Sequence, residues 1–247
     1  MKSVDAYERI RRDCRLPVAA SAQLETDGVV VIPGPDISGG ADRLRSAYDS
    51  EVASADAADV RVSSSTRVTD FVNRSVDFDA LYVHPPLLAA CCQVIGRPFK
   101  LSNTCARILR PGAPAQELHV DVQQGAPDWP MVGYIWMIDD FDEMNGATRY
   151  VPGSHRHSAD PRERGADGSG PTRMQEFLAC GPAGSLIVFD ASIWHGYSAN
   201  RSPYPRRSVQ GHFVSREGSA AIDYRSRMKP ETLARIGDRA RYLLGLA

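Results

Sequence analysis

Helical patterns alternate with a single short apolar run in the first hundred residues. Residues 1–26 follow a helical pattern, and residues 28–33 form a β-branched run that is typical of a strand. Residues 39–58 predict an amphipathic helix, and residues 85–95 predict another that ends at a glycine. We therefore expect a mainly helical N-terminal part over residues 1–98.

From residue 99 onward the pattern changes to short apolar or alternating runs separated by Gly, Pro, Asn and Asp. Many short strands with turn residues between them indicate a β-sandwich or barrel, here over residues 99–216. A helical pattern over residues 228–246 closes the chain. We expect a single domain over residues 1–247 that is mainly β with flanking helices. The predicted strands cover residues 101–109, 118–122, 132–138, 148–151, 185–189 and 208–214.

Composition and charge narrow the class of protein. With 43% hydrophobic residues, 24% charged residues and a net charge of -1, the chain offers no basic patch for a nucleic acid. The five cysteines are odd in number and form no CxxC pair, which favours a reducing cytoplasm over a disulfide framework. Neither a secretory signal nor a membrane span of about 20 apolar residues is apparent. We expect a soluble cytoplasmic protein that binds a small molecule, and the oligomeric state stays open.

His119 and Asp121 are the first candidates for a metal site. In a strand, side chains at i and i+2 point to the same face, so this imidazole and this carboxylate can meet on one ion. His195 follows an apolar run and supplies a third ligand near a predicted strand end. Two imidazoles and one carboxylate on one face of an octahedral ion leave open positions, an arrangement associated with iron(II) oxygenases.

Arg206 is the candidate for binding a 2-oxoacid. It lies eleven residues beyond His195, after a turn and at the start of the last predicted strand. A 2-oxoacid that chelates the metal leaves its distant carboxylate in need of a cation, and a planar guanidinium matches a carboxylate with two hydrogen bonds. Arg207 points to the opposite face and is the weaker candidate.

Two other classes of protein stay open at this point. His-x-Asp pairs arise by chance, and an arginine beside a turn is usually solvated. A zinc or manganese cupin with isomerase or hydrolase chemistry would use the same histidines and aspartate without needing Arg206. A non-enzymatic jelly-roll binding module would need no complete ligand set. Metal content and oxygen dependence distinguish these alternatives from an oxygenase.

Three segments together resemble a known family. They are residues 116–121 (QELHVD), 145–155 (NGATRYVPGSH) and 194–196 (WHG), the last followed by Arg206. In this combination the chain resembles the phytanoyl-CoA dioxygenase family of 2-oxoglutarate-dependent oxygenases. The NGAT and VPGSH segment is the most specific part, and the likeness extends over nearly the whole chain.

The resemblance implies a fold and a set of reactants. The implied fold is a double-stranded β-helix, a jelly roll of the cupin type, and the implied reactants are iron(II), 2-oxoglutarate and O2. His119, Asp121 and His195 become the iron ligands, and Arg206 becomes the residue that binds 2-oxoglutarate.

The resemblance also implies weaker contacts to the cosubstrate. Gln116 and Thr148 fall where family members that act on secondary metabolites contact 2-oxoglutarate. Tyr197 stands where members often have a serine two residues after the distal histidine, so its phenol replaces that hydrogen bond only with altered geometry. The other histidines are expected to be structural: His84, His155, His157 and His212.

The expected reaction is oxidation of an aliphatic C–H bond in a small molecule, with release of succinate and CO2. Hydroxylation, epimerisation, desaturation and cyclisation all begin with abstraction of a hydrogen atom in this family. Related halogenases carry a small residue in place of the first carboxylate, so Asp121 argues against halogenation. The composition and short chain resemble tailoring enzymes of bacterial secondary metabolism, and an acyl-CoA hydroxylase is the alternative.

Substrate recognition is expected in loops above a rigid scaffold. Residues 59–78 are polar and without periodicity, which predicts a long loop, and residues 156–173 predict another. Trp136 and Trp194, close to the metal ligands, are expected to contact the substrate. Three residues of the first loop fit either a substrate-binding or an ordinary surface role: Phe71, Arg67 and Arg74.

Overall fold

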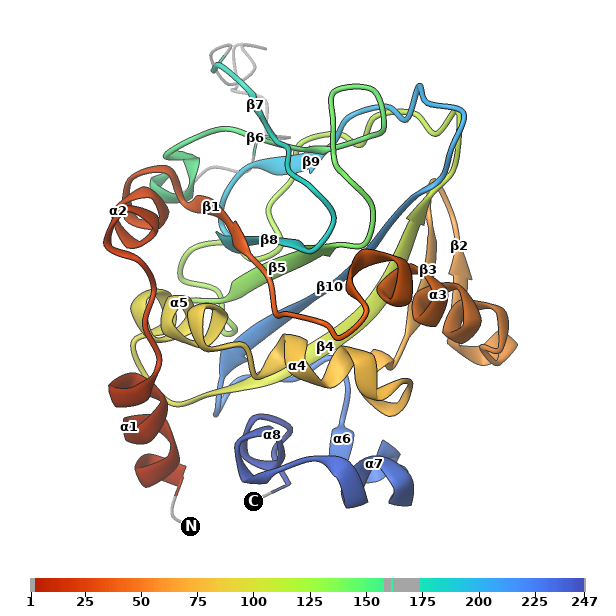
Figure 1. The fold of residues 1–247 in the computed structure, drawn as a ribbon. Coiled ribbons are helices and arrows are strands. Elements are labelled where there is room, and N and C mark those ends of the chain that lie inside the picture. Colours follow the sequence, from red (N-terminus) through yellow and green to blue (C-terminus); the bar gives the residue numbers. More distant parts are fainter. Residues whose placement is uncertain (1–2, 158–160, 162–173, 247) are drawn as a thin grey trace.

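Two antiparallel sheets face each other at the centre of the molecule, and most helices gather on the outer face of the larger sheet (Figure 1). The computed structural model describes residues 3–157, 161 and 174–246. Facing antiparallel sheets of this kind form the expected double-stranded β-helix. The predicted loop at 156–173 lies almost entirely outside the described residues.

The larger sheet has seven strands and the smaller sheet three. Every pairing between neighbouring strands is antiparallel. The larger sheet runs in the order β1 (Val29–Pro33), β8 (Ser185–Asp190), β5 (Val132–Met137), β10 (Arg206–Ser215), β4 (Phe99–Leu109), β3 (Thr66–Thr69) and β2 (Val60–Val62). The smaller sheet runs in the order β7 (Phe177–Ala179), β6 (Thr148–Tyr150) and β9 (His195–Tyr197).

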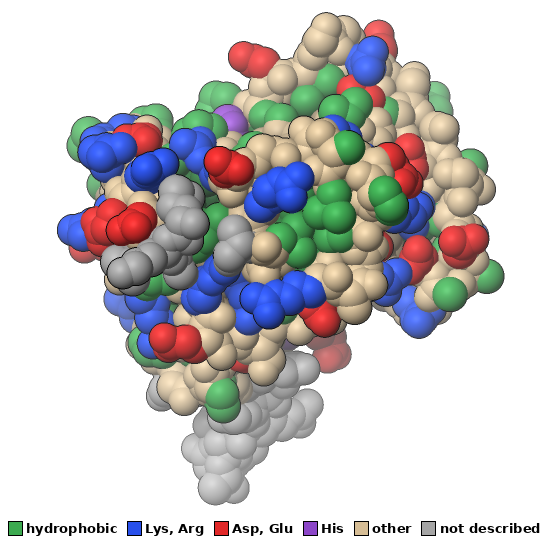
Figure 2. All heavy atoms as spheres, turned by 90° about the horizontal axis from the view of Figure 1, so that it is seen from below, with side chains coloured by type: hydrophobic (Ala, Val, Ile, Leu, Met, Phe, Trp, Pro, Cys, Tyr) green, Lys and Arg blue, Asp and Glu red, His purple; other side chains and the backbone are tan. Residues whose placement is uncertain are grey.

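The helices are mostly short and lie outside the sheets. Figure 2 shows the face formed by the terminal helices, on which acidic and basic side chains are interspersed. The α-helices are α1 (Ser3–Asp13), α2 (Val18–Asp27), α3 (Gly40–Ala53), α4 (Asp79–Tyr82), α5 (Pro85–Ile95), α6 (Tyr224–Arg227), α7 (Pro230–Arg235) and α8 (Asp238–Leu243). Single 3₁₀ turns are η1 (Ala57–Asp59), η2 (Phe71–Asn73), η3 (Val76–Phe78) and η4 (Ser154–Arg156).

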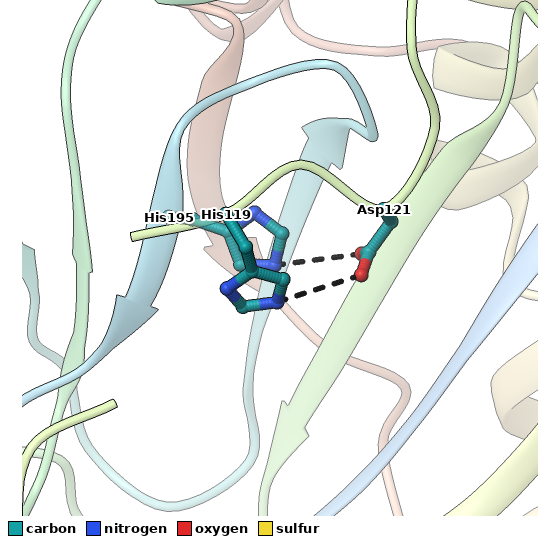
Figure 3. A group of neighbouring side chains, drawn as sticks. All are labelled: His119, Asp121 and His195. Carbon is teal, nitrogen blue, oxygen red and sulfur yellow. Dashed lines mark ion pairs between the residues drawn. The ribbon is translucent and has the colours of Figure 1, made fainter. Parts of the chain in front are cut away.

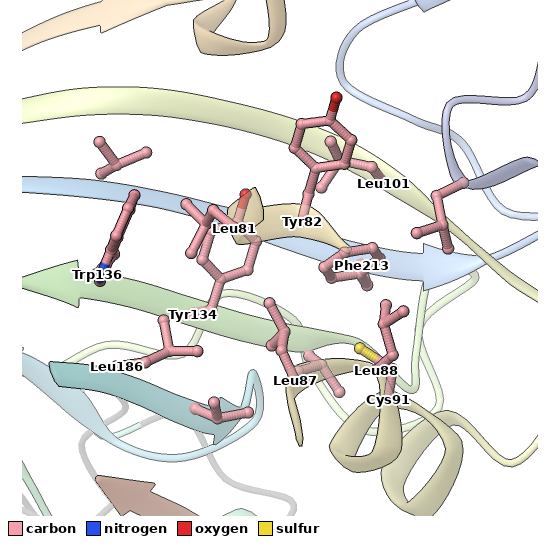
Figure 4. Close-up of a cluster of buried hydrophobic side chains, with 14 of the residues drawn as sticks. Leu81, Tyr82, Leu87, Leu88, Cys91, Leu101, Tyr134, Trp136, Leu186 and Phe213 are labelled. Carbon is pink, nitrogen blue, oxygen red and sulfur yellow. The ribbon is translucent and has the colours of Figure 1, made fainter. Parts of the chain in front are cut away.

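Strand β5 separates two apolar cores because its side chains alternate between its faces. Tyr134 and Trp136 point into the main core between the larger sheet and the helices (Figure 4). Ile135 and Met137 point into a second core between the two sheets. All six residues of this strand are buried, which explains its continuous apolar sequence.

The segment over residues 76–95 is the one described stretch whose length and mean hydropathy of 1.3 fit a membrane span. It consists of three pieces, η3, α4 and α5, rather than one continuous helix. Its apolar side chains Leu81, Leu87 and Leu88 are fully buried in the main core (Figure 4). The high hydropathy of this segment is therefore explained by the burial of its apolar side chains in the main core.

Most predicted strands are confirmed, but the N-terminal part is less helical than expected. It contributes β1 to one edge of the larger sheet and the β2–β3 hairpin to the other. The hairpin replaces much of the loop predicted at 59–78. In β3, Thr66 and Val68 are buried while Arg67 is exposed, an alternation too short to be noticed in the sequence.

Two further predictions are wrong in detail. The strand expected at 118–122 is reduced to one bridge, between His119 and His195. The single helix expected at 228–246 is divided into α7 and α8, because Ile236 and Gly237 adopt extended backbone between them.

Candidate active site

The side chains of His119, Asp121 and His195 converge on one another (Figure 3) and line the cavity between the two sheets. Nε2 of His119 lies 3.7 Å from Oδ1 of Asp121, and Nε2 of His195 lies 3.4 Å from Oδ2. The ligand atoms of the three side chains lie within 4.8 Å of one another. This donor set and spacing fit a divalent ion that retains open coordination positions.

Backbone carbonyls fix the orientation of both imidazoles. Nδ1 of His119 lies 3.2 Å from the carbonyl oxygen of Glu117, and Nδ1 of His195 lies 3.0 Å from that of Ile193. A carbonyl only accepts, so each Nδ1 carries the proton and each Nε2 presents its lone pair toward Asp121. Outer hydrogen bonds of this type are usual for metal-binding histidines.

The electrostatics favour the protonation states that a metal needs. Burial raises the pKa of the Asp121 carboxyl, but electrostatic attraction to His195, His212 and His119, together with a hydrogen bond from His212, outweighs burial and holds that pKa well below its usual value. Burial and the neighbouring His195 lower the pKa of His119. A carboxylate and a neutral imidazole are the metal-binding forms of these side chains.

Strand β9 brings the two histidines together. The N–H of His119 donates to the carbonyl of His195 at 2.9 Å, and the reciprocal bond measures 3.0 Å. Gly196 permits this approach, since a Cβ atom there would lie 2.9 Å from the carbonyl oxygen of Gln116. The glycine after the distal histidine is therefore required by packing.

The VPGSH segment supports the chain just before His195. Gly153 has a φ of 75°, a left-handed conformation that favours glycine. The fully buried Ser154 hydroxyl donates to the carbonyl of Val151 at 2.6 Å and accepts the N–H of Trp194 at 2.9 Å. The most specific motif of the sequence therefore has a structural role beside the ligand set.

Arg206 lies in the same cavity and is buried without a carboxylate partner among the described residues. Its guanidinium stacks 4.2 Å from the centroid of the Phe141 ring, and its Nε has no hydrogen-bond acceptor. Burial and the charge of Arg107 lower the pKa of Arg206 to about 9. A cation kept under these conditions fits an anionic ligand that is still to bind.

The residues expected to contact the cosubstrate also line this cavity. Gln116, Thr148 and Tyr197 are all part of its wall. The hydroxyl groups of Tyr197 and Ser64 lie 2.8 Å apart, so the phenol is held toward the β2–β3 turn. Their roles at a ligand stay predictions.

Two cavity residues were missed in the sequence. His212 was expected to be structural, but its Nε2 lies 2.9 Å from Oδ2 of Asp121 and its ring lines the cavity. Arg107 on β4 is also buried in the cavity wall. His212 and Arg206 lie at even spacing on β10, and that period of two placed them on one face.

Three aromatic residues expected at the substrate lie outside the cavity wall. Trp136 points to the opposite face of β5 and is fully buried in the main core. Phe71 is in the same core, with its ring centroid 4.9 Å from that of Phe78. Trp194 is buried beside His195 but is not part of the wall. Their positions do not support contact with a substrate.

The remaining histidines lie apart from the ligand set, as expected for structural residues. Nε2 of His84 lies 3.2 Å from the carbonyl oxygen of Pro33. Nε2 of His155 lies 3.3 Å from the carbonyl oxygen of Glu25. His157 is exposed at the end of the VPGSH segment.

The chain is similar to known proteins in both sequence and structure. The family profile described as Phytanoyl-CoA dioxygenase (PhyH) matches residues 24–208. "Dioxygenase trt7" of Aspergillus terreus is 28% identical over 214 residues, which cover 78% of this chain and 71% of that protein. "Dioxygenase af480" of Aspergillus fumigatus is 29% identical over 133 residues, and the match spans only 41% of its length and 52% of this chain.

A solved structure agrees with the fold. It is described as the non-heme alpha ketoglutarate dependent carbocyclase SnoK from nogalamycin biosynthesis, and its TM-score is 0.68. The match covers 87% of this chain and 92% of that chain at 17% identity, so it bears on the fold alone. The family profile, by contrast, covers well over half of the sequence. The protein belongs to the phytanoyl-CoA dioxygenase family.

Proposed function

We propose that this protein is an iron(II)- and 2-oxoglutarate-dependent dioxygenase that oxidises an aliphatic carbon of a small molecule of secondary metabolism. The observation that carries this proposal is the position of Arg206. It is a buried cation without a carboxylate partner in the described chain, and it faces the same cavity as the two histidines and Asp121. A metal-dependent isomerase or hydrolase gives no reason to retain such a cation.

The three metal ligands and Arg206 have separate parts in this reaction. Bound by His119, Asp121 and His195, iron(II) supplies redox chemistry in which O2 converts 2-oxoglutarate to succinate and CO2 and oxidises the substrate C–H bond. Arg206 binds the carboxylate of 2-oxoglutarate that is distant from the metal, through two parallel hydrogen bonds.

Apolar and aromatic side chains form part of the cavity wall beside the ligand set. Ile135 and Phe189 line the cavity, and the Phe189 ring lies 4.8 Å from that of His195. Exclusion of water strengthens the ion pair between Arg206 and a carboxylate.

The substrate class is inferred from the relatives. A neighbour in fold, SnoK, is described as a carbocyclase of nogalamycin biosynthesis, which supports a natural product as substrate. All five cysteines are free, which supports a reducing compartment such as the cytoplasm. We infer that the reaction takes place there.

Succinate formation tests the proposal. The protein is reconstituted anaerobically with iron(II), supplied with 2-oxoglutarate and exposed to air, with and without candidate natural products. We expect succinate that depends on both iron and oxygen. His119→Ala and Asp121→Ala should reduce it to background, because each removes a metal ligand.

The matched control is His84→Ala, which removes a histidine remote from the cavity and should retain the activity of the original chain. An outcome of no succinate, tight zinc binding and no binding of 2-oxoglutarate would contradict the proposal. It would favour a metal-dependent cupin without oxidative chemistry.

A further inference from the structure

Three arginines on neighbouring strands form a row that leads into the cavity. Arg61 on β2 pairs with Arg67 on β3, and Arg67 pairs with Arg107 on β4. Directly paired residues of antiparallel strands point to the same face of the sheet, so the three side chains share one face. We call Arg61, Arg67 and Arg107 the arginine row.

The arginine row has no carboxylate partner within the part of the chain that the structure describes. Nε of Arg107 donates to the Ser65 hydroxyl at 3.1 Å, and its guanidinium lies 4.7 Å from the centroid of the Tyr197 ring. Among the described residues, Arg61 donates to the backbone carbonyls of Ala58 and Val60. Like charges in direct cross-strand pairs destabilise a sheet, so the row is costly unless an anion binds to it.

Neighbouring arginines are neutralised in a different way. Arg74 and Arg227 both form ion pairs with Asp59, at 3.2 and 2.9 Å. The chain thus places a carboxylate beside other arginines near this hairpin but not beside the row. Burial and the charge of Arg67 lower the pKa of Arg107, as expected where positive charges face each other.

The cavity has an excess of positive charge. Among the described residues, its wall contains Arg67, Arg107 and Arg206 and one carboxylate, that of Asp121. Three guanidinium groups against one carboxylate leave two positive charges. A divalent ion and a doubly negative 2-oxoglutarate cancel each other, so this excess persists in the loaded enzyme.

We propose that the arginine row binds an anionic group of the primary substrate, a carboxylate or a phosphate, and holds it at the mouth of the cavity. This inference rests on the proposed function, in which one carboxylate of 2-oxoglutarate binds the metal and the other binds Arg206. Arg61 and Arg67 are exposed whereas Arg107 is buried, so the row runs from the surface inward. A cleft lined by one sign of charge raises the local concentration of an oppositely charged ligand.

Two small probes of the same shape test the proposal. Benzoate and benzamide differ in charge, and saturation-transfer NMR measures the binding of each to the full chain. The protein is examined metal-free and loaded with zinc and 2-oxoglutarate, because zinc prevents turnover. We expect benzoate to bind at least about fivefold more tightly than benzamide in the loaded form, because a guanidinium binds a carboxylate with charge-assisted hydrogen bonds.

Arg67→Gln is the main variant, since an exposed side chain can be exchanged without loss of the fold. It should remove the preference for benzoate and leave the affinity for 2-oxoglutarate unchanged. Arg107→Gln should have the same effect on benzoate. Arg9→Gln, an equal change of charge on the remote helix α1, should keep the preference.

Three results would overturn the inference. They are equal binding of both probes to the original chain, an unchanged preference in Arg67→Gln, or a loss of 2-oxoglutarate affinity in Arg67→Gln. The last result would assign the row to a carboxylate of the cosubstrate. If zinc and 2-oxoglutarate fail to bind while metal-free protein still prefers benzoate through Arg67, the proposed function fails and the anion site remains.

Discussion

Nε2 of His212 lies 2.9 Å from Oδ2 of Asp121, and Nδ1 of the same ring lies 3.1 Å from the side-chain oxygen of Asn103. The carboxylate only accepts hydrogen bonds, so Nε2 of His212 carries a proton and donates it. Nδ1 of His212 faces the side-chain amide of Asn103, which holds the ring in place from its other side. The chain from Asn103 through His212 to Asp121 orients the carboxylate from outside the ligand set.

This relationship predicts that His212 is a positioning residue for the metal site. His212→Leu should weaken binding of cobalt(II) or zinc by roughly 10- to 100-fold, because the outer partner of a metal ligand is lost. His212→Gln should recover part of the affinity, since an amide NH2 can donate to Asp121. Competition with a coloured chelator measures the affinities. Equal affinity in all three proteins would refute a positioning role, and circular dichroism controls for folding.

A second prediction concerns the close approach of Gly196 to the His119 segment. Gly196→Ala places Cβ 2.9 Å from the carbonyl oxygen of Gln116 and 3.1 Å from that of Glu117. The backbone must move, so we expect weaker metal binding and a loss of about 1–3 kcal/mol in the free energy of unfolding. Urea denaturation of the metal-free protein gives the second quantity.

The matched control for Gly196→Ala is Gly237→Ala. A Cβ atom at Gly237 meets no other atom within 4 Å, and the residue has a φ of -85°, which alanine adopts readily. The control should retain metal affinity and lose at most about 1 kcal/mol of stability, since alanine is less favourable than glycine at the N-cap of α8. If Gly196→Ala has the same metal affinity and stability as Gly237→Ala, the backbone around Gly196 accommodates a Cβ atom without additional cost.

A third prediction concerns Ser154 in the VPGSH segment. Ser154→Ala removes the acceptor of the Trp194 N–H and the donor to the Val151 carbonyl, at a fully buried position. The expected loss in the free energy of unfolding is about 1–3 kcal/mol, as for other buried hydrogen-bonding groups that lose a partner. Metal affinity should fall as well, because Trp194 precedes His195.

Ser226→Ala provides the comparison for Ser154→Ala. Ser226 is exposed, and its hydroxyl donates to the carbonyl of Asp223 within the same turn. That substitution should change neither stability nor metal affinity. If Ser154→Ala also changes neither stability nor metal affinity, the VPGSH segment does not support the chain before His195.

Local periodicity explains why much of the site was found in the sequence. His119 and Asp121 are two residues apart, and His195 follows an apolar run that is indeed the buried strand β8. The same reasoning covers Arg206 at the start of β10. The same argument could have identified His212, since it lies six residues from Arg206 and therefore on the same face of the strand.

The rest depended on contacts that a local pattern does not contain. Trp136 and Ile135 are equally apolar, and only the pairing of β5 with its neighbours decides which one faces the cavity. The β2–β3 hairpin exists because β3 pairs with β4 about forty residues later, as in the pair of Arg67 with Arg107. Short polar strands of this kind are defined by their partner strand.

The last prediction separates binding from stability at Arg206. Arg206 is only 2% exposed and has no carboxylate partner in the described chain, so the ligand-free protein bears the cost of a buried cation. Arg206→Met keeps much of the volume and removes the charge. We expect it to weaken the binding of 2-oxoglutarate to zinc-loaded protein by roughly 10- to 100-fold, because charge-assisted hydrogen bonds to the ligand are lost.

The same substitution should raise the free energy of unfolding of the metal-free protein, since replacing a buried charge by an apolar side chain often stabilises. Arg206→Lys retains a charge but not the planar fork, so it should bind 2-oxoglutarate weakly without gaining stability. Calorimetry gives the affinities, and urea denaturation gives the stabilities. A loss of stability in Arg206→Met would mean that stacking on Phe141 already compensates the charge, and Arg206 would then need no anion to explain its burial.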